Sequence, residues 1–225
     1  MGHNVFDWNF VAGFIRIVLI DLLLAGDNAF VIAMAVRCLP KGQRIKGMIF
    51  GAGGAVILRI IITFFAFQLL QIQFVKFIGG ILVLWIGIKL QTEGAPDEDN
   101  YREVKNLWHA IWIIMIADIS MSLDNVLAVA GACDGNMFLF IFGLALSIPL
   151  VLFTSNILSI LMDKYPTVIY AGAAILGWVG GRMIITDPFI AIAIHPVPWL
   201  IIGIQLFCAI GVVMAGRTLA IKSDI

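Results

Sequence analysis

The sequence has little charge. Asp, Glu, Lys and Arg together make up 12% of its 225 residues, whereas 62% of the residues are hydrophobic. A soluble domain is usually about half apolar and about a quarter charged. The formal net charge is zero, so the chain has no excess of basic residues with which to bind nucleic acid. These proportions exclude an ordinary soluble domain and place the chain among membrane proteins.

Motifs of several other protein classes are also missing. The three cysteines, Cys38, Cys133 and Cys208, do not follow a metal-ligand spacing. No Walker motif is present, which argues against an ATP-driven pump formed by this chain alone. Residues 1–10 lack the basic segment and small-residue cleavage site of a removable signal. We therefore expect the first apolar run to act as the insertion signal.

Seven apolar runs fill most of the chain. Each is about long enough to cross ~30 Å of hydrocarbon as a helix, although the third is short. The acidic segment 91–106 separates the third run from the fourth, and we expect it to be a solvated linker. The sequence therefore predicts an all-α polytopic membrane protein with seven transmembrane helices, at residues 10–36, 47–70, 74–90, 107–131, 137–161, 168–186 and 198–216.

The basic residues of the loops predict the orientation, because short loops rich in Lys and Arg normally lie in the cytoplasm. Counted along the predicted spans, ten basic residues fall at one membrane face and two, Lys76 and Arg182, at the other. We therefore expect the N-terminus outside, and the C-terminus and the 91–106 linker in the cytoplasm. The ten residues are Arg37, Lys41, Arg44, Lys46, Lys89, Arg102, Lys105, Lys164, Arg217 and Lys222.

One polar motif, Asp-x5-Asp-Asn, occurs twice inside the apolar runs. An ionisable residue inside a span costs about 2.5–3.5 kcal/mol on insertion scales, so such residues usually face a bundle interior or a cavity and mark function. We interpret the two copies as the two halves of one cation site. They are separated by a constant offset of 97 residues, with Asp21, Asp27 and Asn28 in the first copy and Asp118, Asp124 and Asn125 in the second.

The repeat extends beyond the motif. The segment 85–89 in the third run resembles 178–182 in the sixth, while the second and fifth runs match only in their small residues and apolar character. Because three spans per repeat is an odd number, the second copy must enter the membrane from the opposite side. The predicted organisation is a first three-helix repeat (1–90), the charged linker (91–106), a second, inverted repeat (107–187), and a loop with a seventh transmembrane helix (188–225).

The motif residues are hard oxygen ligands, with no Cys or His among them. They suit Mn²⁺, Ca²⁺ or Mg²⁺ rather than Cu⁺ or Zn²⁺. On regular helices Asp27 and Asp124 would point about 100° away from the other motif residues. A local helix break would let both Asp and Asn of each copy converge. Gly26 would permit a break in the first copy, and Ser120 and Ser122 could bond the freed backbone groups in the second, so whether the two helices are broken stays open. Clustered aspartates repel one another unless a cation or protons intervene, which favours metal/proton exchange.

A structural role for the aspartates is the alternative interpretation. Arg59 lies in the middle of the second run and Arg16 lies five residues before Asp21, so either could form an ion pair inside the bundle. Such pairing does not account for a motif duplicated at a fixed spacing. The cation site is therefore the favoured interpretation.

The duplicated motifs resemble those of the TerC family of integral membrane proteins, in particular its short bacterial members. The likeness covers nearly the whole chain. The family is grouped with the LysE-type exporters, and similar members are associated with Mn²⁺ efflux and with supplying metal to exported proteins. The resemblance implies a multi-pass Mn²⁺ exporter of the bacterial cytoplasmic (inner) membrane, with no cofactor besides the transported cation. It also implies a metal site formed by Asp21, Asp27, Asn28, Asp118, Asp124 and Asn125.

Other functions stay open. An exporter of amino acids or small organic solutes would need groups that bind a carboxylate, for which Arg16 and Arg59 are the candidates within the spans. A non-transporting partner that helps to assemble or metallate other proteins would work without the acidic residues. An enzyme, such as an intramembrane aspartate protease, is disfavoured because inverted repeats are typical of transporters. Beyond the lipid bilayer and the divalent ion, the candidate partners are protons as counter-ion, a second copy of the chain, or another membrane protein.

Overall fold

The computed structural model describes residues 26–70, 74–93, 106–132 and 137–223, and within these residues every regular element is a helix. The predicted all-α class is therefore confirmed. The first helical segment covers residues 26–37 of the described part. The other helices are α2 Lys41–Leu70, α3 Val75–Glu93, α4 Leu107–Ala132, α5 Met137–Lys164, α6 Thr167–Ile185, α7 Pro188–Ile194 and α8 Pro198–Ser223.

Four of these helices, α2, α3, α6 and α8, are long and apolar enough to cross a membrane within the described residues. Large apolar side chains on their outer faces are exposed, including Phe50, Trp85 and Phe207. Lipid tails are as apolar as these side chains, so their exposure fits helices that face a bilayer. Each predicted apolar run contains a helix, but the count of seven spans and the inverted arrangement of the repeats stay predictions.

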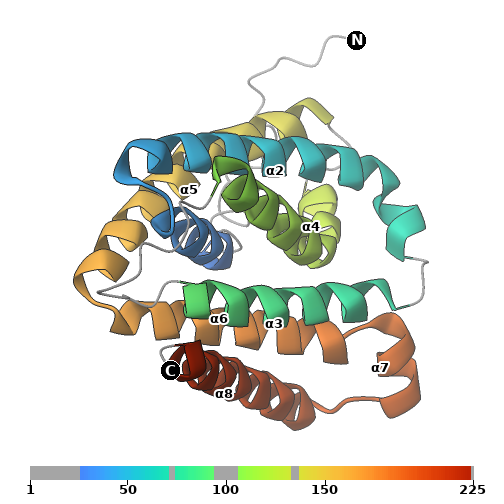
Figure 1. Cartoon of the computed structure of the whole chain (residues 1–225). Helices are drawn as coiled ribbons and strands as arrows, with labels where there is room; N and C mark the ends of the chain where they lie inside the picture. Colours follow the sequence, from blue (N-terminus) through green and yellow to red (C-terminus); the bar gives the residue numbers. More distant parts are fainter. Residues whose placement is uncertain (1–25, 71–73, 94–105, 133–136, 224–225) are drawn as a thin grey trace.

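The helices form two groups (Figure 1). In one, α3 packs against α6 and α8; in the other, α2 packs against α4 and α5. Contacts between α3 and α4 join the two groups. A single cluster of buried apolar side chains runs through both groups, with Met34, Ile114 and Leu176 among its largest members. The motif helices, residues 26–37 and α4, therefore lie inside the bundle rather than at its edge.

Glycines allow α3 and α6 to approach closely. A Cβ atom built on Gly80 would lie 2.7 Å from the carbonyl oxygen of Gly180, and one built on Gly180 would lie 2.9 Å from the carbonyl oxygen of Gly80. Real Cβ atoms do not come this close to a backbone oxygen, so any side chain at either position would push the helices apart. Small residues at such interfaces are typical of membrane bundles, where close backbone packing drives helix association.

We expect Gly80→Ala to lower the melting temperature of the purified protein in detergent by several degrees, because overpacking a tight interface costs about 1–3 kcal/mol. Gly53→Ala in α2 is the matched control, since an added Cβ there meets nothing within 4 Å. The control should melt at nearly the wild-type temperature. Equal melting temperatures for the two variants would contradict the close packing of α3 on α6.

The connection after α6, which the sequence predicted as a loop, contains the short helix α7. The fully buried Asp187 is its N-cap and accepts a hydrogen bond from the Phe189 backbone N–H at 3.0 Å. Its other oxygen accepts from the Phe77 backbone N–H at 3.2 Å, near the start of α3. The Asp187-Pro188 sequence is a typical helix start, with an N-cap acid followed by proline at the first helical position. One carboxylate therefore caps two helix N-termini and joins α3 to α7.

Candidate functional site

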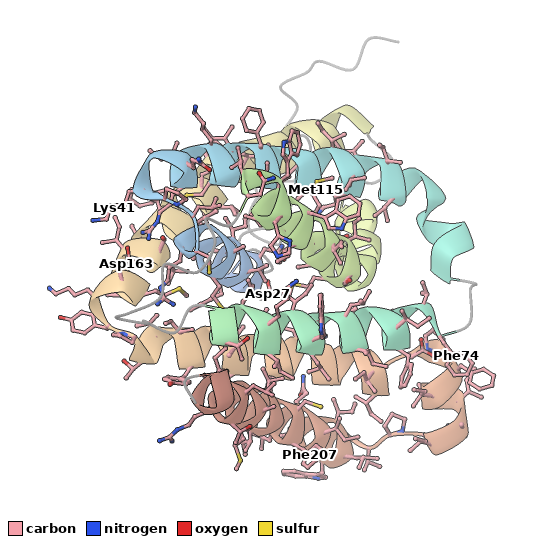
Figure 2. All side chains as sticks on the ribbon, viewed as in Figure 1. Asp27, Lys41, Phe74, Met115, Asp163 and Phe207 are labelled. Atoms are coloured by element: carbon pink, nitrogen blue, oxygen red, sulfur yellow. The ribbon has the colours of Figure 1, made fainter. Side chains whose placement is uncertain are left out.

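The first copy of the motif begins the described part of the chain. Residues 26–37 are helical, so Gly26, Asp27 and Asn28 lie within a helix, whereas Asp21 lies outside the described residues. Asn28 is buried, and its backbone N–H donates to the Asp27 Oδ1 atom at 3.0 Å. Figure 2 places Asp27 in the middle of the molecule, whereas the labelled Lys41, Phe74 and Phe207 lie toward its periphery. The described part of the first motif, Asp27 and Asn28, therefore lies inside the bundle.

The second copy of the motif lies on α4, with Asp118 buried at 7% exposure. The helix continues without a break to Ala132, so the local break that the sequence left open is absent from α4. The Ser120 hydroxyl donates to the Ile116 carbonyl at 2.9 Å and the Ser122 hydroxyl donates to the Ile119 carbonyl at 3.1 Å. A hydroxyl can bond a carbonyl of the preceding turn while the helix stays intact. The serines are therefore accommodated within a regular helix.

Arg59 reaches the second motif from α2. The two helices run in the same direction, since Gly47 lies against Leu107 and Gly54 lies against Met115. Continuing this register brings Arg59 to Asp118, where the Nη2 and Oδ1 atoms are 2.5 Å apart. The side chains are 8% and 9% exposed, so the ion pair is buried. The alternative interpretation, in which the aspartates have a structural role, requires ion pairs with arginine, and such a pair is present for Asp118.

A cavity opens beside this ion pair. Its volume is about 30 Å³, compared with about 10–15 Å³ for a space that holds one water molecule. In the described part of the chain, its polar lining is formed by Asn28, Arg59 and Asp118, and the other described lining residues are apolar. Among the described residues, the Asn28 Oδ1 and Asp118 Oδ2 atoms are buried without a hydrogen-bond partner. Buried polar atoms are normally paired, so these two oxygens need a donor or a cation. The apolar lining residues are Val31, Ile32, Ala52, Ala55, Val56, Ile114, Ile148 and Val151.

The structure thus brings two of the predicted site residues, Asn28 and Asp118, to one cavity, and Asp27 lies next to Asn28 in the helix but is not among the lining residues. The Asp27 carboxyl is close enough to Arg59 and Asp118 to interact with both electrostatically. The side chains of Asp124 and Asn125, like Asp21, lie outside the described part, and their place in the site stays a prediction. Within the described residues, no three His, Cys, Asp or Glu side chains form a metal-binding cluster.

Arg59 is a site residue that the predicted metal-site set did not include. Its sequence signal is a single arginine in the middle of an apolar run, which was considered as a structural partner for the aspartates and as a carboxylate-binding group of a solute exporter. Intramembrane charges normally face the interior and mark function whichever sign they carry. The cavity therefore combines carboxylate and amide oxygens with one cation of the protein itself.

A second charged cluster lies away from the cavity, where α5 ends. Asp163 pairs with Arg44 and has its Oδ1 atom 3.6 Å from the Arg37 Nε atom. Arg44 also donates to the backbone carbonyls of Arg37 at 3.0 Å and Leu39 at 3.2 Å. This cluster fastens the turn between residues 37 and 41 to the C-terminal end of α5. Because Asp163 is partly exposed, the cluster offers matched charge-removal controls for the buried pair.

The sequence is similar to a family of membrane proteins and to several of its bacterial members. A sequence model of the integral membrane protein TerC family matches residues 6–224. The uncharacterized membrane protein YjbE of Bacillus subtilis is 44% identical over 179 residues, which cover 80% of this chain and 82% of that protein. YkoY of the same organism is 30% identical over 192 residues, covering 76% of this chain and 59% of YkoY.

A more distant relative is the inner membrane protein YgdQ of Escherichia coli, which is 24% identical over 186 residues, 75% of this chain and 78% of YgdQ. No solved structure matches the chain.

Proposed function

The chain belongs to the TerC family of integral membrane proteins. On that premise we propose that it exports a divalent metal ion from the cytoplasm, with Mn²⁺ as the leading candidate. The proposed site is formed by the two Asp-Asn motifs, with Asp27, Asn28 and Asp118 as ligands, joined by Asp21, Asp124 and Asn125. The observation that carries the proposal is the buried cavity at which Asn28 from one motif meets Asp118 from the other.

The chemistry of the cavity supports a hard cation. The two oxygens without a described partner, Asn28 Oδ1 and Asp118 Oδ2, are an amide and a carboxylate oxygen. Such oxygens are preferred ligands of Mn²⁺, Ca²⁺ and Mg²⁺, while softer metals prefer sulfur or imidazole. Asp27 adds a second carboxylate within electrostatic range. Backbone carbonyls, protons and water would complete the coordination and the charge balance.

The size of the cavity favours an ion over an organic solute. Its volume of about 30 Å³ is far below the roughly 300–1,000 Å³ of a pocket for a drug-sized molecule. The Arg59–Asp118 pair is nevertheless the arrangement that a zwitterion such as an amino acid would complement. An exporter of small organic solutes is therefore the second candidate, and it requires a conformation with a larger cavity.

The directions of the helices support the inverted repeat that alternating access requires. Gly79 lies against Met183, and Gly87 lies against Leu176, so α3 and α6 run antiparallel. In a chain with three spans per repeat, the third and sixth spans point in opposite directions and the second and fourth point in the same direction. The packing of α3 on α6 and of α2 on α4 fits both requirements. Rocking one repeat against the other would expose the cavity to each side of the membrane in turn.

The proposed location is the bacterial cytoplasmic membrane, with the N-terminus outside and the C-terminus inside. The family and the apolar helices support a membrane location. The clustering of Arg37, Arg44 and Asp163 at the end of α5 gathers positive charge where the cytoplasmic face is predicted.

Flux through reconstituted protein tests the proposal. Purified protein in vesicles that contain a Mn²⁺-sensitive dye should admit Mn²⁺ well above the protein-free rate. Asp27→Asn and Asp124→Asn should each reduce the initial rate by about tenfold or more, since each removes a ligand charge. Flux of an amino acid, with no flux of Mn²⁺, Ca²⁺ or Mg²⁺, would favour the organic-solute exporter. Absence of any flux in folded wild-type protein would favour the non-transporting assembly partner.

A further inference from the structure

The proposed metal site already contains a positive charge of the protein. The Arg59 Nη2 atom lies 2.5 Å from Asp118 Oδ1, and both side chains line the same cavity. A guanidinium does not lose its proton in proteins, so this charge is permanent. A metal that binds Asp118 must therefore either share the carboxylate with Arg59 or displace it.

We propose that Arg59 is a tethered counter-cation, which holds the Asp118 carboxylate whenever the carrier has no metal and is displaced when the metal binds. This inference rests on the proposed metal transport. It adds a residue that sets the affinity for the metal and allows the empty carrier to reorient across the membrane. An unpaired carboxylate is costly inside a membrane, and an unpaired arginine is costly as well. Exchange of one cation for another at Asp118 keeps that carboxylate compensated through the cycle, and the displaced guanidinium stays within electrostatic range of the Asp27 carboxyl.

The contact between Arg59 and Asp118 suits an exchangeable partner. The Arg59 Nη2 atom donates to one carboxylate oxygen of Asp118, Oδ1, while Oδ2 is buried without a hydrogen-bond partner among the described residues. Arginine and carboxylate held as a fixed structural pair often form two parallel hydrogen bonds. The second oxygen of Asp118 and the Asn28 amide oxygen thus stay accessible to an incoming ion.

The cavity that Arg59 lines continues along α2 toward the N-terminus of that helix. Ala55 and Ala52 precede Arg59 by four and seven residues, and both line the cavity with it. Side chains on a helix lean toward its N-terminus, so Arg59 lies over these small residues. Its long, flexible stem can follow this surface along α2 when a metal takes its place at Asp118.

Two consequences separate this role from a purely structural ion pair. Because Mn²⁺ must compete with a tethered cation, Arg59 lowers the affinity of the site. Removing that competitor should make Mn²⁺ bind more tightly. The empty carrier would then lack the charge that compensates Asp118 during its return, so net flux should slow while exchange of Mn²⁺ for Mn²⁺ continues.

The test compares Arg59→Gln with wild type by calorimetric titration of Mn²⁺ into purified protein, and by flux in vesicles. Arg59→Gln should lower the Kd for Mn²⁺ by about tenfold. Its net Mn²⁺ flux should fall by about tenfold, while radioactive Mn²⁺ exchange at equal concentrations on both sides stays within about threefold of wild type. Arg59→Lys, which keeps the charge in a more compact head group, should give intermediate values for both.

Arg44→Gln removes an arginine that pairs with Asp163 outside the cavity and should leave the Kd at the wild-type value. Unchanged or weaker Mn²⁺ binding in both Arg59→Gln and Arg59→Lys, with wild type still binding and transporting Mn²⁺, would overturn the role of Arg59 and leave the proposed function intact. If Arg59→Gln does not fold, weaker binding in Arg59→Lys alone would overturn it. Absence of Mn²⁺ binding in wild type would overturn both.

Discussion

Asp118→Asn should abolish Mn²⁺ transport, with an initial rate about 100-fold below that of wild type. Asn has almost the same shape as Asp, so the substitution removes the charge and leaves the volume of the cavity unchanged. The loss removes a ligand of the metal and leaves the buried Arg59 guanidinium without its carboxylate partner at 2.5 Å. A divalent cation would then meet a site with a net positive side chain and one fewer negative oxygen.

The measurement is the initial rate of Mn²⁺ entry into vesicles that contain equal amounts of folded protein. Asp163→Asn is the matched control, because it removes a carboxylate that also pairs with arginine but lies outside the cavity and is partly exposed. Its rate should stay within about twofold of wild type, as exposed ion pairs contribute little. The double variant Arg59→Gln/Asp118→Asn removes both buried charges, so it separates lost transport from lost folding. Mn²⁺ flux near the wild-type rate in Asp118→Asn would exclude this carboxylate from the path.

Arg59→Leu should destabilise the protein by about 3–5 kcal/mol, because removing one partner leaves the other charge buried and unpaired. The double variant Arg59→Leu/Asp118→Leu should regain most of this free energy, since two apolar side chains replace a buried pair at little cost. Reversible unfolding in detergent mixtures gives the four free energies of the cycle. Saturating Mn²⁺ should also restore stability to Arg59→Leu, because the metal then compensates Asp118.

The corresponding cycle on Arg44 and Asp163 is the control for this prediction. Both residues contact each other at the end of α5, but the Asp163 side chain is 36% exposed. Single substitutions there should cost about 1 kcal/mol or less. Equal and small costs for the two cycles would show that the Arg59–Asp118 pair is solvated rather than buried.

The sequence identified the motif residues because carboxylates are rare in apolar runs and these recur at one spacing. Asp27, Asn28 and Asp118 do converge on a single region. Arg59 was identified from the sequence as a possible ion-pair partner of the aspartates, but which aspartate it pairs with was out of reach for a physical reason. Its contact depends on α2 lying beside α4 in a parallel register, and apolar periodicity does not specify which helices are neighbours.

Two local features could not be derived from the sequence, for different reasons. A break in α4 would have let Asp118 and Asp124 point in the same direction, yet the Ser120 and Ser122 hydroxyls bond carbonyls of their own helix and the helix stays regular. The short helix α7 was missed because Asp187-Pro188 was interpreted as the start of a loop. The Asp187 carboxylate caps α7 and also accepts a hydrogen bond at the start of α3. This tertiary contact cannot be predicted from the local sequence.

The most direct test of the two-half site is the stoichiometry and affinity of Mn²⁺ binding to the purified protein, measured by calorimetric titration. We expect one Mn²⁺ per chain in wild type. Asp27→Asn, in the first motif, and Asp118→Asn, in the second, should each weaken binding by about tenfold or more. Weaker binding in both variants would support one ion held between the two motifs. Wild-type affinity in both variants, or binding that depends on only one motif, would contradict a shared site.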